Sequence, residues 1–123
     1  MTEVEKQSLI DNNVDLKNAM ARFVNNEALY LSFLKKFPDD SNFCAILPNL
    51  ESKNYDEAYK AAHALKGIAG NLGINSVFEP NNELLTLLKG NTEGADISAE
   101  AMAIYERIAK GFEEISLIIR AIE

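Results

Sequence analysis

Apolar residues recur at helical spacing along the chain, and this periodicity restricts the fold more than any other feature. Residues three and four positions apart lie on one face of an α-helix. The predicted last helix, residues 98–122, has a heptad-like apolar seam formed by Ala101, Ile104, Ile108, Ile115, Ile118 and Ile122, with Gly111 in the missing position. The alternating pattern of β-strands is almost absent. We therefore predict an all-α protein.

Capping residues divide the first half of the chain into three predicted helices. Asp15 is placed to cap a short helix that ends near Phe23, and a second helix ends at Pro38. Residues 39–41 can cap a third helix, which Pro48 should kink or distort at its start because proline removes a helix donor. Residues 1–14 form an N-terminal lead-in.

Two more helices are predicted before the last one. Asn54 followed by Glu57 resembles a capping box, and the helix that it opens runs to about residue 71, with Gly73 ending it. The next helix begins at about residue 77 or 79 and ends at residue 88, so Pro80 falls in its first turn. A polar loop, residues 89–96, precedes the last helix.

These elements predict one domain that spans residues 1–123. The chain length suits a single domain, and a hydrophobic content of 47% is enough to bury a core. The architecture that fits is an up-down-up-down four-helix bundle with one or two short N-terminal capping helices. The long last seam should fold inward, so we expect a monomer.

Charge and cysteine content exclude several classes of protein. A net charge of −7 argues against nucleic acid or an anionic membrane as the main partner. No apolar stretch approaches the roughly 20 residues of a membrane span, and the N-terminus lacks the pattern of a signal peptide. The single cysteine, Cys44, allows no internal disulfide and suggests a reducing compartment. We expect a cytoplasmic protein in which Cys44, within an apolar run, is a small core residue.

The only histidine, His63, is predicted to lie on the exposed side of its helix. The apolar stripe of that helix consists of Ala58, Ala61, Ala62, Leu65, Ile68, Ala69 and Leu72. His63 falls nearly opposite the centre of this stripe at 100° per residue. A lone histidine is ordinarily a satisfied core or cap residue. Its position argues against that interpretation here but leaves an idle surface histidine open.

Two glycines follow His63 on the same face. Gly67 and Gly70 lie one and two turns beyond it, and together they cost the helix roughly 1–2 kcal/mol relative to alanine. Packing does not explain them, because the core lies on the other side; close approach of another molecule does, with tolerated drift as the alternative. Lys66 lies one turn after His63 and can neutralise an anion that a nucleophilic imidazole carries. Taken alone, such a lysine is ordinary.

The segment AHALKGIAGNLG is similar to the signature of histidine-containing phosphotransfer domains of bacterial two-component phosphorelays. The matching residues are His63, Leu65, Lys66, Gly67, Ala69, Gly70, Asn71, Leu72 and Gly73. Residues 15–37 also resemble the N-terminal pair of helices of that family, in the pattern of Phe23, Asn26, Leu29, Tyr30, Leu34 and Phe37. The resemblance implies a four-helix bundle with a short N-terminal helical cap.

The resemblance also implies a function. His63 would accept a phosphoryl group from the aspartyl phosphate of a receiver domain and pass it reversibly to another receiver. Lys66 would neutralise the phosphate, while Gly67 and Gly70 let the receiver dock. The partners would be response regulators or the receiver domains of hybrid kinases, in a sensor histidine kinase pathway.

The chain is expected to bring no cofactor of its own. Mg²⁺ and most of the transition-state stabilisation would come from the receiver. The sequence has no glycine-rich nucleotide loop and no room for an ATP-binding domain, so we expect no autonomous kinase activity.

Three further residues are candidates for docking. Tyr59, Lys60 and Ile74 lie near His63 in the predicted helical arrangement. Each of them also fits an ordinary surface or helix-end residue.

Two positions depart from the family pattern. Pro80 interrupts the helix after His63, and Leu85 stands where relatives often have glutamate. A side chain that hydrogen-bonds the imidazole therefore cannot be assigned by resemblance. Asn81, Asn82 and Glu83 are the alternatives within the chain.

Two other functions compete with phosphotransfer. The chain could be an adaptor or inhibitor that docks on a receiver without accepting phosphate, although such a protein would not need His63. It could also be a metal- or haem-binding bundle, but one histidine and one cysteine on different helices make a poor ligand set. We expect no metal site.

Overall fold

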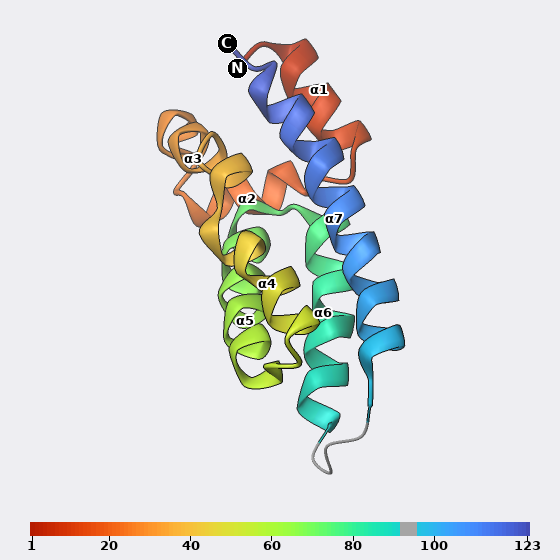
Figure 1. Cartoon of the computed structure of the whole chain (residues 1–123). Helices are drawn as coiled ribbons and strands as arrows, with labels where there is room; N and C mark the ends of the chain where they lie inside the picture. The colour runs from red at the N-terminus through yellow and green to blue at the C-terminus, as the bar shows by residue number, and fades with distance from the viewer. Residues whose placement is uncertain (92–95) are drawn as a thin grey trace.

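The computed structural model describes residues 1–91 and 96–123, and this part of the chain is helical, without a β-strand (Figure 1). The prediction of an all-α protein is confirmed. The elements are α1 (Glu3–Asp11), α2 (Leu16–Arg22), α3 (Glu27–Leu34), the 3₁₀ turn η1 (Phe37–Asp39), α4 (Ser41–Glu51), α5 (Tyr55–Leu72), α6 (Asn75–Gly90) and α7 (Ser98–Arg120).

The first helix lies where only a lead-in was predicted. Thr2 and Glu5 form a capping box at its start: the Glu5 N–H donates to Thr2 Oγ1 at 3.1 Å and the Thr2 N–H to Glu5 Oε1 at 2.8 Å. Leu9 is the only residue of α1 that is buried, so its apolar periodicity is too weak to detect in the sequence. The helix packs beside the end of α7, near both chain termini (Figure 1).

Helix α4 begins as predicted but places its cysteine differently. Asp40 caps it by accepting a hydrogen bond from the Phe43 N–H at 2.9 Å, and the helix continues through Pro48 to Glu51. Ile46 and Leu50 form its buried side. Cys44 is exposed, so the prediction of a core cysteine is wrong. Two residues turn a helix by about 200°, which points Cys44 away from Ile46.

Helix α5 supplies the centre of the core, and its end is fixed by backbone geometry. Gly73 adopts a left-handed conformation at φ +74°, which confirms the predicted stop. The Tyr30 hydroxyl, from α3, donates to the Leu72 carbonyl at 2.8 Å and holds the last turn. At the other end, Asn54 is the N-cap, but its side chain accepts no capping hydrogen bond. The predicted capping box with Glu57 is therefore wrong.

Helix α6 is longer than predicted at both ends. It begins at Asn75, so Pro80 lies inside the helix and not in its first turn. Proline has no N–H, and the carbonyl of Ser76 therefore lacks its usual helical partner. The backbone of α7 approaches at this turn, because a Cβ atom on Gly111 would overlap the Ser76 carbonyl. The helix continues to Gly90, into the predicted loop, and residues 92–95 of that loop lie outside the described residues.

Each of the four long helices packs against two others around the core. Helix α5 packs against α4 and α6, and α7 packs against α6 and α4. The buried residues of α5 are Ala58, Ala61, Ala62, Leu65, Ala69 and Leu72, while Ile68 is half-buried. The small alanine side chains allow close approach of the neighbouring helices. Of the predicted seam in α7, Ile104 and Ile118 are only half-buried, whereas Phe112 and Ile119 join the core.

Candidate functional site

His63 lies in the middle of α5 on its exposed side, as the sequence predicted. Its neighbours in sequence, Ala61 and Ala62, are buried, so the helix separates the imidazole from the core. The ring of Tyr59, one turn earlier, lies 6.0 Å from the imidazole between centroids, at a tilt of 32°. The two rings therefore form one surface on α5, with the imidazole open to solvent.

Lys66 and Gly67 continue this surface beyond His63. Both residues are exposed. A Cβ atom added to Gly67 would meet nothing within 4 Å, so no packing within the chain requires glycine there. The described structure therefore gives no packing reason for the bare backbone beside the imidazole.

Gly70 differs from Gly67, and the expectation that packing does not require it is wrong. A Cβ atom at Gly70 would lie 3.0 Å from Cε2 of Phe78 on α6, and the residue is half-buried. Gly70 therefore lets the Phe78 ring lie against α5. The contact with Phe78 therefore explains why position 70 has no side chain. Gly70 still lies on the same face of α5 as His63.

Arg22 is a residue of this surface that the sequence analysis missed. From the end of α2, its Nη1 donates to the Gly70 carbonyl at 2.9 Å and lies 3.5 Å from that of Asn71. It joins the N-terminal helices to the exposed face of α5 and adds a positive charge beyond Lys66. No spacing within the sequence indicates this contact, because it joins residues 48 positions apart.

The three candidates for holding the imidazole have different environments. Asn81 is fully buried, and its Nδ2 donates to the Ala62 carbonyl at 2.8 Å, directly before His63. Glu83 is engaged by Arg107 of α7 through two hydrogen bonds of 2.8 and 2.6 Å, which lower the pKa of its carboxyl. Asn82 keeps a buried Oδ1 without a hydrogen-bond partner, as does Asn81. Among the described residues, no side chain hydrogen-bonds His63.

The two remaining docking candidates, Lys60 and Ile74, differ in exposure to solvent. Lys60 is exposed, and its ammonium lies 3.1 Å from Glu57 Oε1 in an exposed pair. Ile74 is completely buried between α5 and α6, where it belongs to the core. The prediction that Ile74 contributes to a docking surface is therefore wrong, because the chain turns inward directly after Gly73.

An apolar groove lies between the second half of α5 and the chain from the end of α2 to η1. It has a volume of about 420 Å³, and its walls include Phe23, Phe33 and Phe37 from the α2–η1 region and Ile68 from α5. Phe33 is 47% exposed, which is high for a side chain of this size. The groove adds apolar surface on the α3 side of α5.

Within residues 1–91 and 96–123, no three His, Cys, Asp or Glu side chains lie together as a metal ion would need. No helix of this part of the chain has both the length and the apolar character to span a bilayer.

Comparison with known proteins adds no family to this description. No protein-family model, curated protein or solved structure matches the chain.

Proposed function

We propose that the chain is a phosphorelay intermediate in which His63 accepts a phosphoryl group from one receiver aspartate and gives it to another. The observation that carries the proposal is the surface around His63: an open imidazole opposite the buried stripe of α5, followed by Lys66 and by Gly67, which no internal contact requires. A surface of this kind suits a nucleophile that must enter the active site of a second protein.

The transfer itself needs little from this chain. The Nε2 lone pair attacks phosphorus, the P–N bond forms as the P–O bond to the aspartate breaks, and the carboxylate of the receiver leaves. Lys66 then offsets part of the charge on the new phosphoryl group. The receiver supplies Mg²⁺ and the groups that stabilise the transition state. The chain thus acts as a phosphotransfer protein without kinase activity or a cofactor of its own.

The fold that we propose for this function is an up-down-up-down four-helix bundle of α4 to α7. The cap consists of three short helices, α1 to α3, where the sequence predicted one or two. Support for the bundle is the order of packing, in which α4 contacts α5, α5 contacts α6, and α7 contacts both α6 and α4. Successive long helices run in opposite directions in Figure 1. Such an arrangement holds the exposed face of α5 on a rigid support.

The partners that fit are receiver domains of response regulators or hybrid kinases, within a sensor histidine kinase pathway in the cytoplasm. Support comes from the same surface and from the net charge of −7, which disfavours nucleic acid. We propose that the chain acts as a monomer, because the exposed His63 face would then be open to each receiver in turn.

The direct test is transfer of radiolabelled phosphate. The purified chain and its His63→Gln variant are mixed with a labelled phospho-receiver and Mg²⁺. Acid-labile, base-stable label on the wild type alone is the expected result. If receivers bind but none passes label to the wild type, His63 is not an acceptor, and the chain is an adaptor or inhibitor that docks on receivers.

A further inference from the structure

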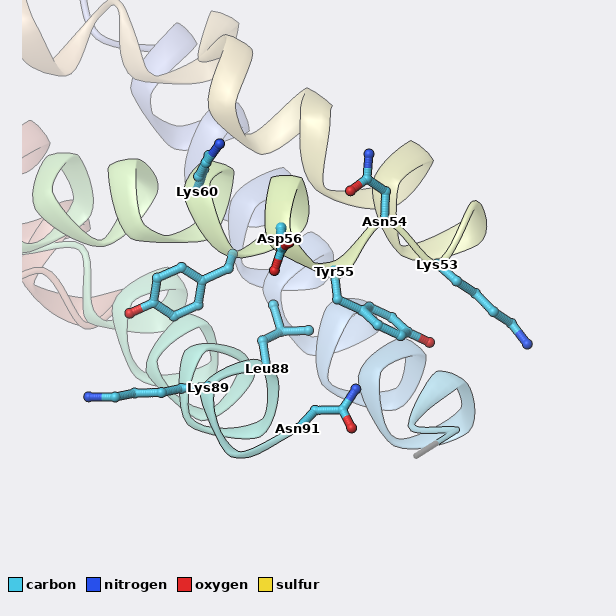
Figure 2. A pocket seen from close by; sticks show the side chains of 9 residues that line it. Lys53, Asn54, Tyr55, Asp56, Lys60, Leu88, Lys89 and Asn91 are labelled. Atoms are coloured by element: carbon cyan, nitrogen blue, oxygen red, sulfur yellow. The ribbon is translucent and has the colours of Figure 1, made fainter. Parts of the chain in front are cut away.

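A second groove lies one turn before His63, between the start of α5 and the end of α6. It has a volume of about 660 Å³. Tyr55, Tyr59 and Leu88 contribute apolar surface to it. Lys53, Lys60 and Lys89 also line it; the side chains of Lys53 and Lys89 extend outward at its two ends, while that of Lys60 rises from α5 away from Leu88 (Figure 2). We call it the basic groove. Neither the phosphate chemistry of His63 nor the packing of the core accounts for it.

The charge of the basic groove is opposite to that of the chain. The molecule has a net charge of −7, yet three of its 12 Lys and Arg residues line this one groove. Asp56 is the only carboxylate among the residues that line it. A basic surface on an acidic protein attracts acidic partners and speeds their association.

Two of these lysines already pair with a carboxylate of the chain, but both pairs are exposed, so another carboxylate can replace the partner. Lys53 lies 4.0 Å from Asp96, and both side chains are more than 60% exposed. Lys60 lies 3.1 Å from Glu57, with 72% and 51% of the two side chains exposed. Exposed pairs of this kind are weak. An incoming carboxylate can therefore replace Asp96 or Glu57 without breaking a buried contact.

The basic groove is continuous with the surface of His63. Tyr59 lines the groove, and its ring lies 6.0 Å from the imidazole. A specific protein interface covers about 800 Å² on each partner. A protein that seats its active site on His63 therefore extends over the groove.

We infer that the basic groove binds an acidic segment of the receiver domain that docks on His63, and that it helps to select among receivers. The inference rests on the proposed function, since it takes the receiver as the partner. Carboxylates of that segment would face Lys53, Lys60 and Lys89, while an apolar side chain packs on Tyr55 and Leu88. The groove then acts on docking and not on the phosphoryl group.

The test compares two double variants with the same change of charge. In the first, Lys53→Gln and Lys89→Gln remove two positive charges from the groove. In the control, Lys17→Gln and Lys110→Gln remove two exposed charges from α2 and α7, outside the groove. Circular dichroism checks that each protein is folded.

The probes are receiver domains from the source organism, each phosphorylated with acetyl phosphate and Mg²⁺. Transfer to His63 is measured at several salt concentrations. Phosphoramidate, a small donor that needs no docking, gives the reactivity of His63 in each protein as a reference. For the receiver that transfers best, the groove variant should lose about tenfold in kcat/KM relative to that reference, mainly through KM and with a weaker salt dependence.

The outcomes separate the inference from the proposed function. If the wild type takes label from a receiver and the groove variant matches the control variant, the groove does not dock the receiver and the inference is wrong. A wild type that takes label from no receiver contradicts the proposed function itself, and the inference fails with it. Loss confined to the groove variant supports both.

Discussion

At the scale of single residues, the exposed face of α5 contains two glycines with different physical roles. Gly67 faces open space, whereas Gly70 lies against the ring of Phe78. The sequence alone presents them as equivalent, since both follow His63 at helical spacing. Only the packing of α6 on α5 distinguishes the glycine that faces open space from the one that contacts Phe78.

This difference predicts unequal effects of two alanine substitutions on stability. Gly67→Ala should raise the free energy of unfolding by about 0.5–1 kcal/mol, because alanine favours the helix and its Cβ meets nothing. The same variant should slow phosphotransfer, since the methyl group occupies the surface beside His63. Gly70→Ala should gain less stability or none, because its Cβ presses on Phe78. Urea denaturation checks the stabilities, and a loss of stability in Gly67→Ala would contradict the open surface.

The prediction of the His63 face succeeded because it depends on one helix. Within α5, the periodicity of the alanines and Leu65 fixes which side is buried, and His63 must lie opposite. Arg22 and the basic groove could not be predicted in this way, because they arise where α2 or α6 meets α5. Ile74 was misplaced for the same reason: a turn after Gly73 directs it into the core.

At the scale of helices, the contact between α6 and α7 depends on an unusual pair of turns. Pro80 removes the helical partner of the Ser76 carbonyl, and Gly111 lets the α7 backbone lie against that carbonyl. The sequence indicates a gap in the α7 seam at Gly111 but does not show what fills it. Pro80 lies inside α6 because the helix begins at Asn75, earlier than the sequence predicts.

This contact predicts that α7 does not tolerate a methyl group at its centre. Gly111→Ala should lower the free energy of unfolding by about 1–3 kcal/mol, because the backbone of Ser76 cannot move aside without disturbing α6. Gly90→Ala is the matched control, since its Cβ would meet nothing within 4 Å. Thermal unfolding of the two variants gives the comparison. Equal midpoints would mean that α6 and α7 lie further apart than described.

At the scale of the whole molecule, stability should depend on pH through a tyrosine that joins the cap to the core. Burial raises the pKa of Tyr30, whose hydroxyl donates to the Leu72 carbonyl. Unfolding exposes the phenol, which then ionises near its ordinary pKa of 10.0. The unfolded chain therefore releases the proton first, so this contribution to stability is complete below pH 10 and declines as the pH rises above it.

The measurement is the urea midpoint at pH 9 and at pH 11. The midpoint of the wild type should fall between these values by more than that of Tyr30→Phe, which has no phenol to ionise. Lysines titrate alike in both proteins, so they cancel in the comparison. Tyr30→Phe itself should be less stable at pH 9 by about 1–2 kcal/mol, because the Leu72 carbonyl loses its donor. Parallel pH profiles would show that Tyr30 is not buried.

The buried and exposed sides of α5 differ in how freely their residues can be exchanged. The alanines and leucines on one side are tied to neighbouring helices, and few substitutions there preserve their close packing. Lys60, Lys66 and Gly67 are exposed on the other side, where their side chains take no part in the buried core. Under the proposed function, substitutions at these exposed positions can change which receiver docks on His63 while the packing of the core stays the same.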